Sequence, residues 1–248
     1  ANLYPDWIKT SSAITEDFNG DGFYDIVATS SQSPASRPGG VSIIFGESLN
    51  SFKTPYSYPA GRDKGGYPAQ IVTGDFNNDG KIDICAMTNR IDFLEGNGDG
   101  TFFAGQIAYS GGEQGGALRK ADFDKDGNLD LIWRQAYVYN QRYAVYVVYG
   151  NGNGTFTFGN KIQWGSTSGL DVDNLIVSDF NGDTYPDFAT FADYSSSGSD
   201  VYANLDVFLY DPSNPRNFIH SASLPELDIG LTRGRALAAG DLDGDGIV

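Results

Sequence analysis

Asp17-Phe-Asn-Gly-Asp-Gly-Phe-Tyr-Asp25 is the stretch that decides the fold, because it returns along the chain at long and similar intervals. The further copies are Asp75-Phe-Asn-Asn-Asp-Gly-Lys-Ile-Asp83, Asp122-Phe-Asp-Lys-Asp-Gly-Asn-Leu-Asp130 and Asp179-Phe-Asn-Gly-Asp-Thr-Tyr-Pro-Asp187, and a fifth begins as Asp241-Leu-Asp-Gly-Asp-Gly-Ile247. Their first aspartates are 58, 47, 57 and 62 residues apart. Self-similarity at such a period is typical of repeat architectures, including propellers.

Short apolar segments of strand type flank the copies. They lie at residues 13–15, 71–73 and 175–177 before a copy, and at residues 26–28, 84–86 and 131–133 after one. A second motif follows at residues 96–102 and 150–156, Gly-Asn-Gly-(Asp/Asn)-Gly-Thr-Phe, with altered versions at 46–52 and 211–218. Asn-Gly and Asp-Gly between strands indicate tight hairpins. Each unit therefore contains four strands, which predicts an all-β fold, a β-propeller of four-stranded antiparallel blades.

Glycine-rich segments separate the units and are expected to carry the chain from one blade to the next. The units are predicted at about residues 11–69, 70–116, 117–173 and 174–235, with an incomplete unit at 236–248. No proline-rich or charged linker divides the sequence. We therefore expect one domain spanning residues 1–248.

Composition excludes several classes of protein. Lys and Arg total 16 against 32 Asp and Glu, so the formal charge of −16 argues against nucleic-acid binding, which needs a positive surface. No apolar stretch is long enough to suggest membrane insertion, and no signal peptide is visible. The single cysteine, Cys85, excludes an internal disulfide framework and is expected to be a buried thiol.

Positions 1, 3, 5 and 9 of every complete aspartate loop carry Asp or Asn. Oxygen ligands at alternate positions, with a backbone carbonyl at position 7, suit a hard cation of calcium's size. The predicted calcium ligands are Asp17, Asn19, Asp21, the Phe23 carbonyl and Asp25; Asp75, Asn77, Asp79, the Lys81 carbonyl and Asp83; Asp122, Asp124, Asp126, the Asn128 carbonyl and Asp130; Asp179, Asn181, Asp183, the Tyr185 carbonyl and Asp187; and Asp241, Asp243, Asp245 and the Ile247 carbonyl.

The alternative interpretation is that Asp, Asn and Gly gather here only because they tolerate turns. Five copies with the same order of residues favour metal binding over this interpretation. In addition, 16 of the 32 acidic side chains stand at predicted ligand positions. So many carboxylates in short loops repel one another without a cation.

The loop is not an EF-hand. Position 12 would require a bidentate Glu and is Ala28, Ala86, Trp133 or Thr190 in the four complete copies. Position 6, where the loop must turn sharply, is Gly in every copy except the fourth, which has Thr184. The fourth loop is therefore the complete copy that departs furthest from the pattern.

The aspartate loop together with Gly-Asn-Gly-Asp-Gly-Thr-Phe resembles the FG-GAP/VCBS repeats of calcium-binding β-propellers, which occur in integrin α-subunit heads and in several lectins. The resemblance covers residues 11–248. It implies a seven-bladed propeller, outside the cell or on its surface, with structural calcium between the first two strands of each blade. Four complete units and the opening of a fifth are fewer repeats than seven blades need.

Carbohydrate binding or adhesion is the predicted function, with glycans or cell-surface glycoconjugates as partners. The candidate ligand-binding residues in or near the crossovers are Arg62, Asp63, Tyr67, Glu113, Arg119, Trp164, Asp171 and Arg233. For any single one of these residues, ordinary packing or solvation is the favoured interpretation. No catalytic residue is predicted, because the only histidine, His220, falls in an expected outermost strand. A calcium-rich polysaccharide lyase and an integrin-like adhesion scaffold remain the alternatives.

Overall fold

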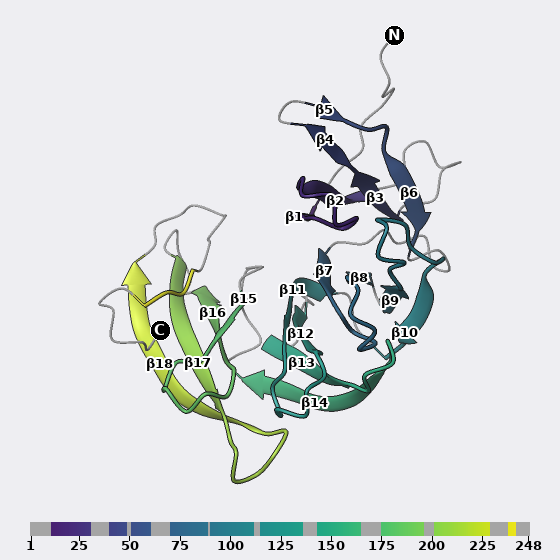
Figure 1. Cartoon of the computed structure of the whole chain (residues 1–248). Helices are drawn as coiled ribbons and strands as arrows, with labels where there is room; N and C mark the ends of the chain where they lie inside the picture. The colour runs from purple at the N-terminus through teal and green to yellow at the C-terminus, as the bar shows by residue number, and fades with distance from the viewer. Residues whose placement is uncertain are drawn as a thin grey trace. The chain divides into compact units, whose positions relative to one another are not determined.

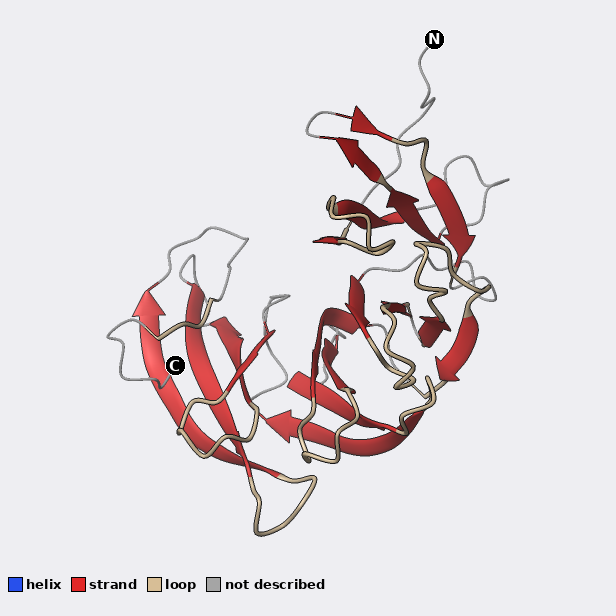
Figure 2. Ribbon diagram, viewed as in Figure 1, coloured by secondary structure: helices blue, strands red, loops and turns tan. Residues whose placement is uncertain are grey.

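The computed structural model describes residues 11–30, 40–48, 51–60, 70–88, 90–111, 115–135, 143–164, 175–195, 201–228 and 238–241. Strands, turns and loops account for these ranges, and Figure 2 draws no helix among them. Within them, no helix is therefore long and apolar enough to cross a membrane. The predicted all-β class is confirmed.

The described chain contains four sheets of four antiparallel strands, which we call blades 1 to 4 (Figure 1). Blade 1 is β1 (Ala13–Glu16), β2 (Asp25–Ser30), β3 (Gly40–Ile44) and β6 (Tyr56–Pro59), and blade 2 is β7 (Gln70–Gly74), β8 (Asp83–Met87), β9 (Ile91–Leu94) and β10 (Gln106–Tyr109). Blade 3 is β11 (Gly115–Ala121), β12 (Asp130–Gln135), β13 (Tyr143–Gly150) and β14 (Phe156–Trp164), and blade 4 is β15 (Leu175–Ser178), β16 (Asp187–Ser195), β17 (Val201–Tyr210) and β18 (Phe218–Asp228). The predicted four-strand unit is confirmed four times; the number of blades in a closed propeller stays a prediction.

Each aspartate loop connects the first two strands of its blade. In blade 1, Glu16 pairs with Asp25, so the strands meet on either side of the loop. Gly74 pairs with Asp83 in blade 2, and the same register recurs in blade 4. A further small hairpin, β4 (Gly46–Ser48) with β5 (Ser51–Phe52), precedes the outermost strand of blade 1. The loop is thus a hairpin connection that the strand register fixes at both ends.

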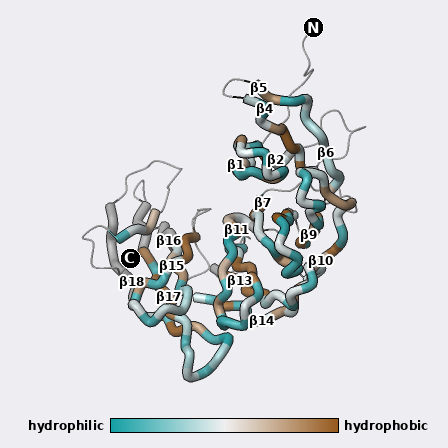
Figure 3. Tube along the Cα trace, viewed as in Figure 1, coloured by the Kyte–Doolittle hydropathy of each residue, from teal (hydrophilic) through white to brown (hydrophobic). Residues whose placement is uncertain are grey.

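The chain forms two compact units, each with its own hydrophobic core. Unit 1 comprises Ala1–Gly115 with Asn151–Phe156, and unit 2 comprises Gly116–Gly150 with Thr157–Val248. Val27, Ile43 and Ile84 are buried in the first core, and a second cluster of buried aliphatic and aromatic side chains fills unit 2. Apolar stretches follow strands such as β13, while the connecting loops are largely hydrophilic (Figure 3). The single-domain boundary stays a prediction.

An aromatic contact links each of the first three aspartate loops to the hairpin of the following repeat. Position 2 of the loop is Phe, and its ring meets the Phe that ends the next hairpin in a T-shaped contact. The pairs are Phe18 with Phe102 (5.9 Å between ring centroids), Phe76 with Phe156 (6.0 Å) and Phe123 with Phe218 (5.5 Å). Offset and edge contacts of this kind add about 0.5–1.5 kcal/mol beyond the burial of area.

Candidate metal loops

The aspartate at position 9 is the buried anchor of every complete loop. Asp25, Asp83, Asp130 and Asp187 are all fully buried. In the third loop, Oδ2 of Asp130 accepts the Phe123 N–H at 2.8 Å and Oδ1 accepts the Gly150 N–H at 2.9 Å. The other three copies make the same two bonds, to position 2 and to a residue at or just after the end of the third strand. One side chain therefore ties the loop to a neighbouring strand.

Burial works against the charge of these four carboxylates. It raises the pKa of Asp130 to about 7 and that of Asp83 to about 6. The pKa values of Asp25 and Asp187 are raised for the same reason. The two backbone N–H donors lower each pKa, while the other aspartates of the loop raise it. A cation beside the loop would favour the ionised form.

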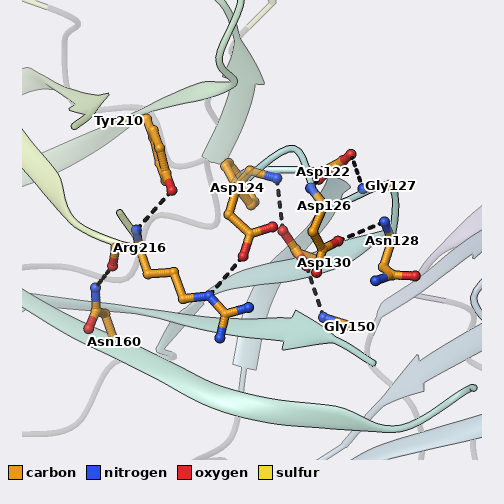
Figure 4. A network of polar contacts seen from close by, with 11 residues as sticks. Asp122, Asp124, Asp126, Gly127, Asn128, Asp130, Gly150, Asn160, Tyr210 and Arg216 are labelled. Carbon is orange, nitrogen blue, oxygen red and sulfur yellow. Dashed lines mark hydrogen bonds and ion pairs between the residues drawn. The ribbon is translucent and has the colours of Figure 1, made fainter. Parts of the chain in front are cut away.

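Positions 1 and 5 fold the loop around its own carboxylates. In the third loop, Asp122 accepts the N–H groups of Asp126 at 3.1 Å and Gly127 at 3.0 Å, and Asp126 accepts that of Asn128 at 2.8 Å (Figure 4). The same three bonds recur in the first, second and fourth loops. Acidic oxygens are thereby drawn to one side of a tight turn.

Position 6 turns the chain through the left-handed region. Gly22, Gly80 and Gly127 have φ angles of 88°, 81° and 90°, a region that glycine enters without steric cost. Thr184 adopts 75° at the same position of the fourth loop, despite its branched side chain. The expected turn is confirmed in the four complete copies, and the fourth makes it under strain.

The third loop gathers the acidic oxygens that best fit a metal ion. Asp122, Asp124 and Asp130 each offer one carboxylate oxygen, and these atoms lie within 4.8 Å of one another. The Asp124 side chain is 9% exposed, and its Oδ1 is buried with no hydrogen-bond partner among the described residues. An orphaned, buried acceptor inside an acidic triad is what a cation would satisfy.

Arg216 holds the other oxygen of Asp124. Its Nε lies 2.7 Å from Asp124 Oδ2 (Figure 4). Its guanidinium lies 4.3 Å from the centre of the Tyr149 ring. Its backbone N–H donates to the Tyr210 hydroxyl, and its carbonyl accepts the Asn160 amide. Arg216 lies in the altered hairpin between β17 and β18, so the repeat pattern gave no sign of this pair.

Asparagine at position 3 behaves differently from Asp124. The Asn19 amide donates to Asp21 at 3.0 Å, and the Asn181 amide donates to Asp183 at 3.0 Å. In both loops the asparagine oxygen accepts the position-5 N–H. Position 3 thus engages position 5 within these loops, whereas Asp124 engages an arginine from the next blade.

Most of the predicted ligand-binding residues lie outside the described residues. These are Arg62, Asp63, Tyr67, Glu113, Asp171 and Arg233, and of the fifth loop Asp243, Asp245 and Ile247; only Asp241 is described there. Arg119 lies within β11, where its guanidinium donates to the Leu118 carbonyl at 2.8 Å. Trp164, predicted in a crossover, instead ends β14 with a buried ring whose N–H donates to Asp206 at 2.8 Å, and its part in ligand binding stays a prediction.

His220 lies in β18, the outermost strand of blade 4, as predicted. Its ring stacks on Phe208 with 4.6 Å between centroids, and Nε2 lies 2.9 Å from Asp206 Oδ1. Buried Asp206 therefore binds both His220 and Trp164 through its two oxygens. This network fastens the outer strands, and sequence reasoning missed it because the pattern around Asp206 is that of an ordinary strand.

Comparison with known proteins identifies the repeat. The family model described as FG-GAP-like repeat matches residues 17–86 and 84–133, which include the first three aspartate loops. No curated protein matches the sequence. Among solved structures, an Agrocybe aegerita lectin described as recognising non-reducing terminal N-acetylglucosamine matches with a TM-score of 0.46 and 16% identity. That match covers 88% of this chain and 67% of the lectin chain.

Proposed function

We propose, from the premise that this chain carries FG-GAP-like repeats on four-stranded β-blades, that it is a calcium-stabilised propeller module that binds glycans. The observation that carries the calcium part is the third loop, where a buried oxygen of Asp124 lacks a partner beside Asp122 and Asp130. The repeat family, with its adhesion and lectin members, supports the glycan part.

Calcium would have a structural role. In the third loop Asp122, Asp124, Asp126, Asp130 and the Asn128 carbonyl would hold it, and the equivalent groups would do so in the other loops. A bound divalent ion supplies the positive charge that lets buried carboxylates stay ionised. Since each loop joins the first two strands of its blade, the ion would stabilise the hairpin on which the blade is built.

Binding rather than catalysis is the proposed activity. The loop carboxylates already accept backbone hydrogen bonds, and His220 is engaged with Asp206. We place the protein outside the cell, because extracellular modules bind calcium with dissociation constants of about 10⁻⁴–10⁻³ M and this concentration is available there. Glycoconjugates on a surface would then be its partners.

Metal content tests the calcium part. The purified full chain, brought to equilibrium by dialysis against millimolar calcium, is expected to retain calcium in excess of the dialysis buffer by elemental analysis. Asp122→Ala should lose about one equivalent, because it removes a first-position ligand from one loop. Asp211→Ala is the matched control, since Asp211 is a partly exposed hairpin residue outside the aspartate loops, bonded to Ser213. A chain that retains no calcium in either form contradicts the proposal.

A glycan array, probed with the full chain in calcium and again in chelator, tests the glycan part. We expect signals on a subset of glycans that weaken in chelator. A parallel assay for unsaturated sugar products on acidic polysaccharides tests the lyase alternative. An array without signal at high protein concentration rejects glycan binding, and unsaturated products would replace it with the lyase.

A further inference from the structure

A cavity of about 170 Å³ lies in unit 1, between blade 1 and the hairpin of blade 2. Three aromatic side chains of blade 1, Phe45, Tyr56 and Tyr58, form one side of it. Its polar lining is Asn19, Lys53, Asp99 and Thr101. Phe45 is buried and Tyr56 is 60% exposed, so the aromatic side runs from the core to solvent.

The equivalent place in unit 2 shows what such a position can hold. Gly46 and Gly150 donate in the same way to the position-9 aspartates, so the preceding residues, Phe45 and Tyr149, occupy equivalent positions. Over Tyr149 lies the Arg216 guanidinium, which also binds Asp124, the counterpart of Asn19. A planar polar group thus fits between this aromatic ring and position 3 of the aspartate loop.

Gly100, in the second hairpin, occupies the position that is equivalent to Arg216 in the fourth hairpin. Both have positive φ, 82° and 66°, and both precede the hairpin phenylalanine by two residues. A Cβ on Gly100 would lie 2.3 Å from the Phe45 ring and 3.1 Å from Asn19 Cβ, so the glycine lets the hairpin approach both. With no side chain at Gly100, no guanidinium lies between Asn19 and Phe45, and the cation over the Phe45 ring is the Lys53 ammonium, 6.0 Å from the ring centroid.

The charges of the cavity favour a neutral guest. Lys53 and Asp99 contribute one positive and one negative group, and Asn19 is neutral where the guanidinium in unit 2 meets Asp124. Asp99 Oδ1 accepts the Thr101 N–H at 2.9 Å and the Thr101 hydroxyl at 2.5 Å, so Oδ2 takes part in neither bond. These bonds lower the pKa of Asp99 and keep it an acceptor. Lys53, which also lines the cavity, provides hydrogen-bond donors.

We infer that this cavity binds one neutral sugar ring, an inference that rests on the proposed glycan-binding function. The C–H face of the ring would lie against Tyr56 and Phe45, and adjacent hydroxyls would bind Asp99 and Lys53. The volume is below the ~300–1,000 Å³ typical of pockets for drug-sized ligands, so it suits a terminal residue of a glycan. In blade 2, Glu95 replaces Phe45, which assigns the site to the first junction.

Monosaccharide binding to the full chain tests the site. Methyl glycosides of glucose, galactose, mannose, fucose and N-acetylglucosamine are titrated singly, with saturation-transfer difference NMR as the readout. We expect at least one to bind, and Tyr56→Ser to weaken it about tenfold because the stacking surface is lost. Tyr24→Ser is the matched control, since Tyr24 is also an exposed tyrosine of unit 1 and does not line the cavity.

Asp99→Asn tests the polar side without disturbing the hairpin. Asn153 stands at the equivalent position of the next hairpin and makes the same two bonds to Thr155, so asparagine preserves this turn. We expect binding to weaken severalfold because a charged acceptor is replaced by a neutral one. If sugar binds but Tyr56→Ser and Asp99→Asn bind as well as the parent, the site is overturned and the proposed function stands. If neither the array nor any glycoside shows binding, the sugar site and the proposed glycan-binding function are both rejected.

Discussion

Asp124 and Arg216 are a matched pair of changes within the repeat. The first two loops have Asn19 and Asn77 at the Asp124 position, and the hairpins that follow have Gly100 and Gly154 at the Arg216 position. The acidic side chain and the arginine that binds it therefore occur together. Arg216 thereby provides a hydrogen bond to one carboxylate oxygen of Asp124, whose side chain is only 9% exposed.

Arg216→Gly should reveal this dependence. It restores the glycine of the other hairpins but leaves Asp124 Oδ2 without its partner, so we expect a loss of about 1–3 kcal/mol in the free energy of unfolding in metal-free buffer. The double variant Asp124→Asn/Arg216→Gly recreates the combination at Asn19 and Gly100 and should recover most of that loss. Urea unfolding measures both. Losses that simply add across the two changes would contradict the pairing.

Thr184→Gly should stabilise the fourth loop. A branched residue at φ 75° costs about 1–2 kcal/mol, and glycine costs about 0.5–1 kcal/mol in unfolded-chain entropy, which leaves a net gain of about 0.5–1 kcal/mol. The reverse change, Gly127→Thr at the same position of the third loop, should lose about 1–2 kcal/mol. Thermal unfolding of both variants is the measurement, and equal shifts in the same direction would refute the strain argument.

At the scale of elements, the hairpin phenylalanine joins successive repeats. Phe102 is 6% exposed and contacts both Phe18 and Tyr58 of blade 1, whereas its neighbour Phe103 is 52% exposed. Phe102→Ala should therefore cost about 3–5 kcal/mol in the free energy of unfolding, as for other buried phenylalanines. Phe103→Ala, in the same hairpin, should stay within about 0.5 kcal/mol of the parent. Chemical unfolding of the two variants measures these losses of stability. Similar losses would mean that the Phe102 ring contacts do not join the successive repeats.

The strands and loops were predictable because their signals are local. Residues 13–15, 84–86 and 131–133 lie in strands as expected, and the aspartate loops connect them. Contacts between segments far apart in sequence were not predictable. The bonds from position 9 to Gly150, from Arg216 to Asp124 and from Trp164 to Asp206 depend on how strands are placed side by side. The buried position of Trp164 shows that a residue at a strand end cannot be read as surface from composition alone.

For the whole molecule, the excess of acidic over basic side chains is the main electrostatic cost of folding. The formal charge is −16, and half of the acidic side chains stand at loop positions. Net charge of one sign destabilises a compact state through self-repulsion. Added salt screens charges that are far apart, but it acts less on clustered, partly buried groups. Specific divalent binding should thus stabilise the chain beyond what salt achieves.

Removing calcium should consequently lower the melting temperature of the full chain. Calcium at about ten times its dissociation constant stabilises by about 1.4 kcal/mol per site, so four complete loops together would contribute about 5–6 kcal/mol. One kcal/mol shifts the melting temperature by about 2–4 °C for a chain of this size, so we expect a fall on the order of 10 °C or more. Calorimetry in millimolar calcium and in chelator, at equal ionic strength, measures it. Magnesium should restore little of the lost melting temperature. It requires near-octahedral geometry and gives up its waters reluctantly, so these flexible loops are expected to bind it poorly. A melting temperature that follows ionic strength alone would show that the aspartates serve only as turn residues.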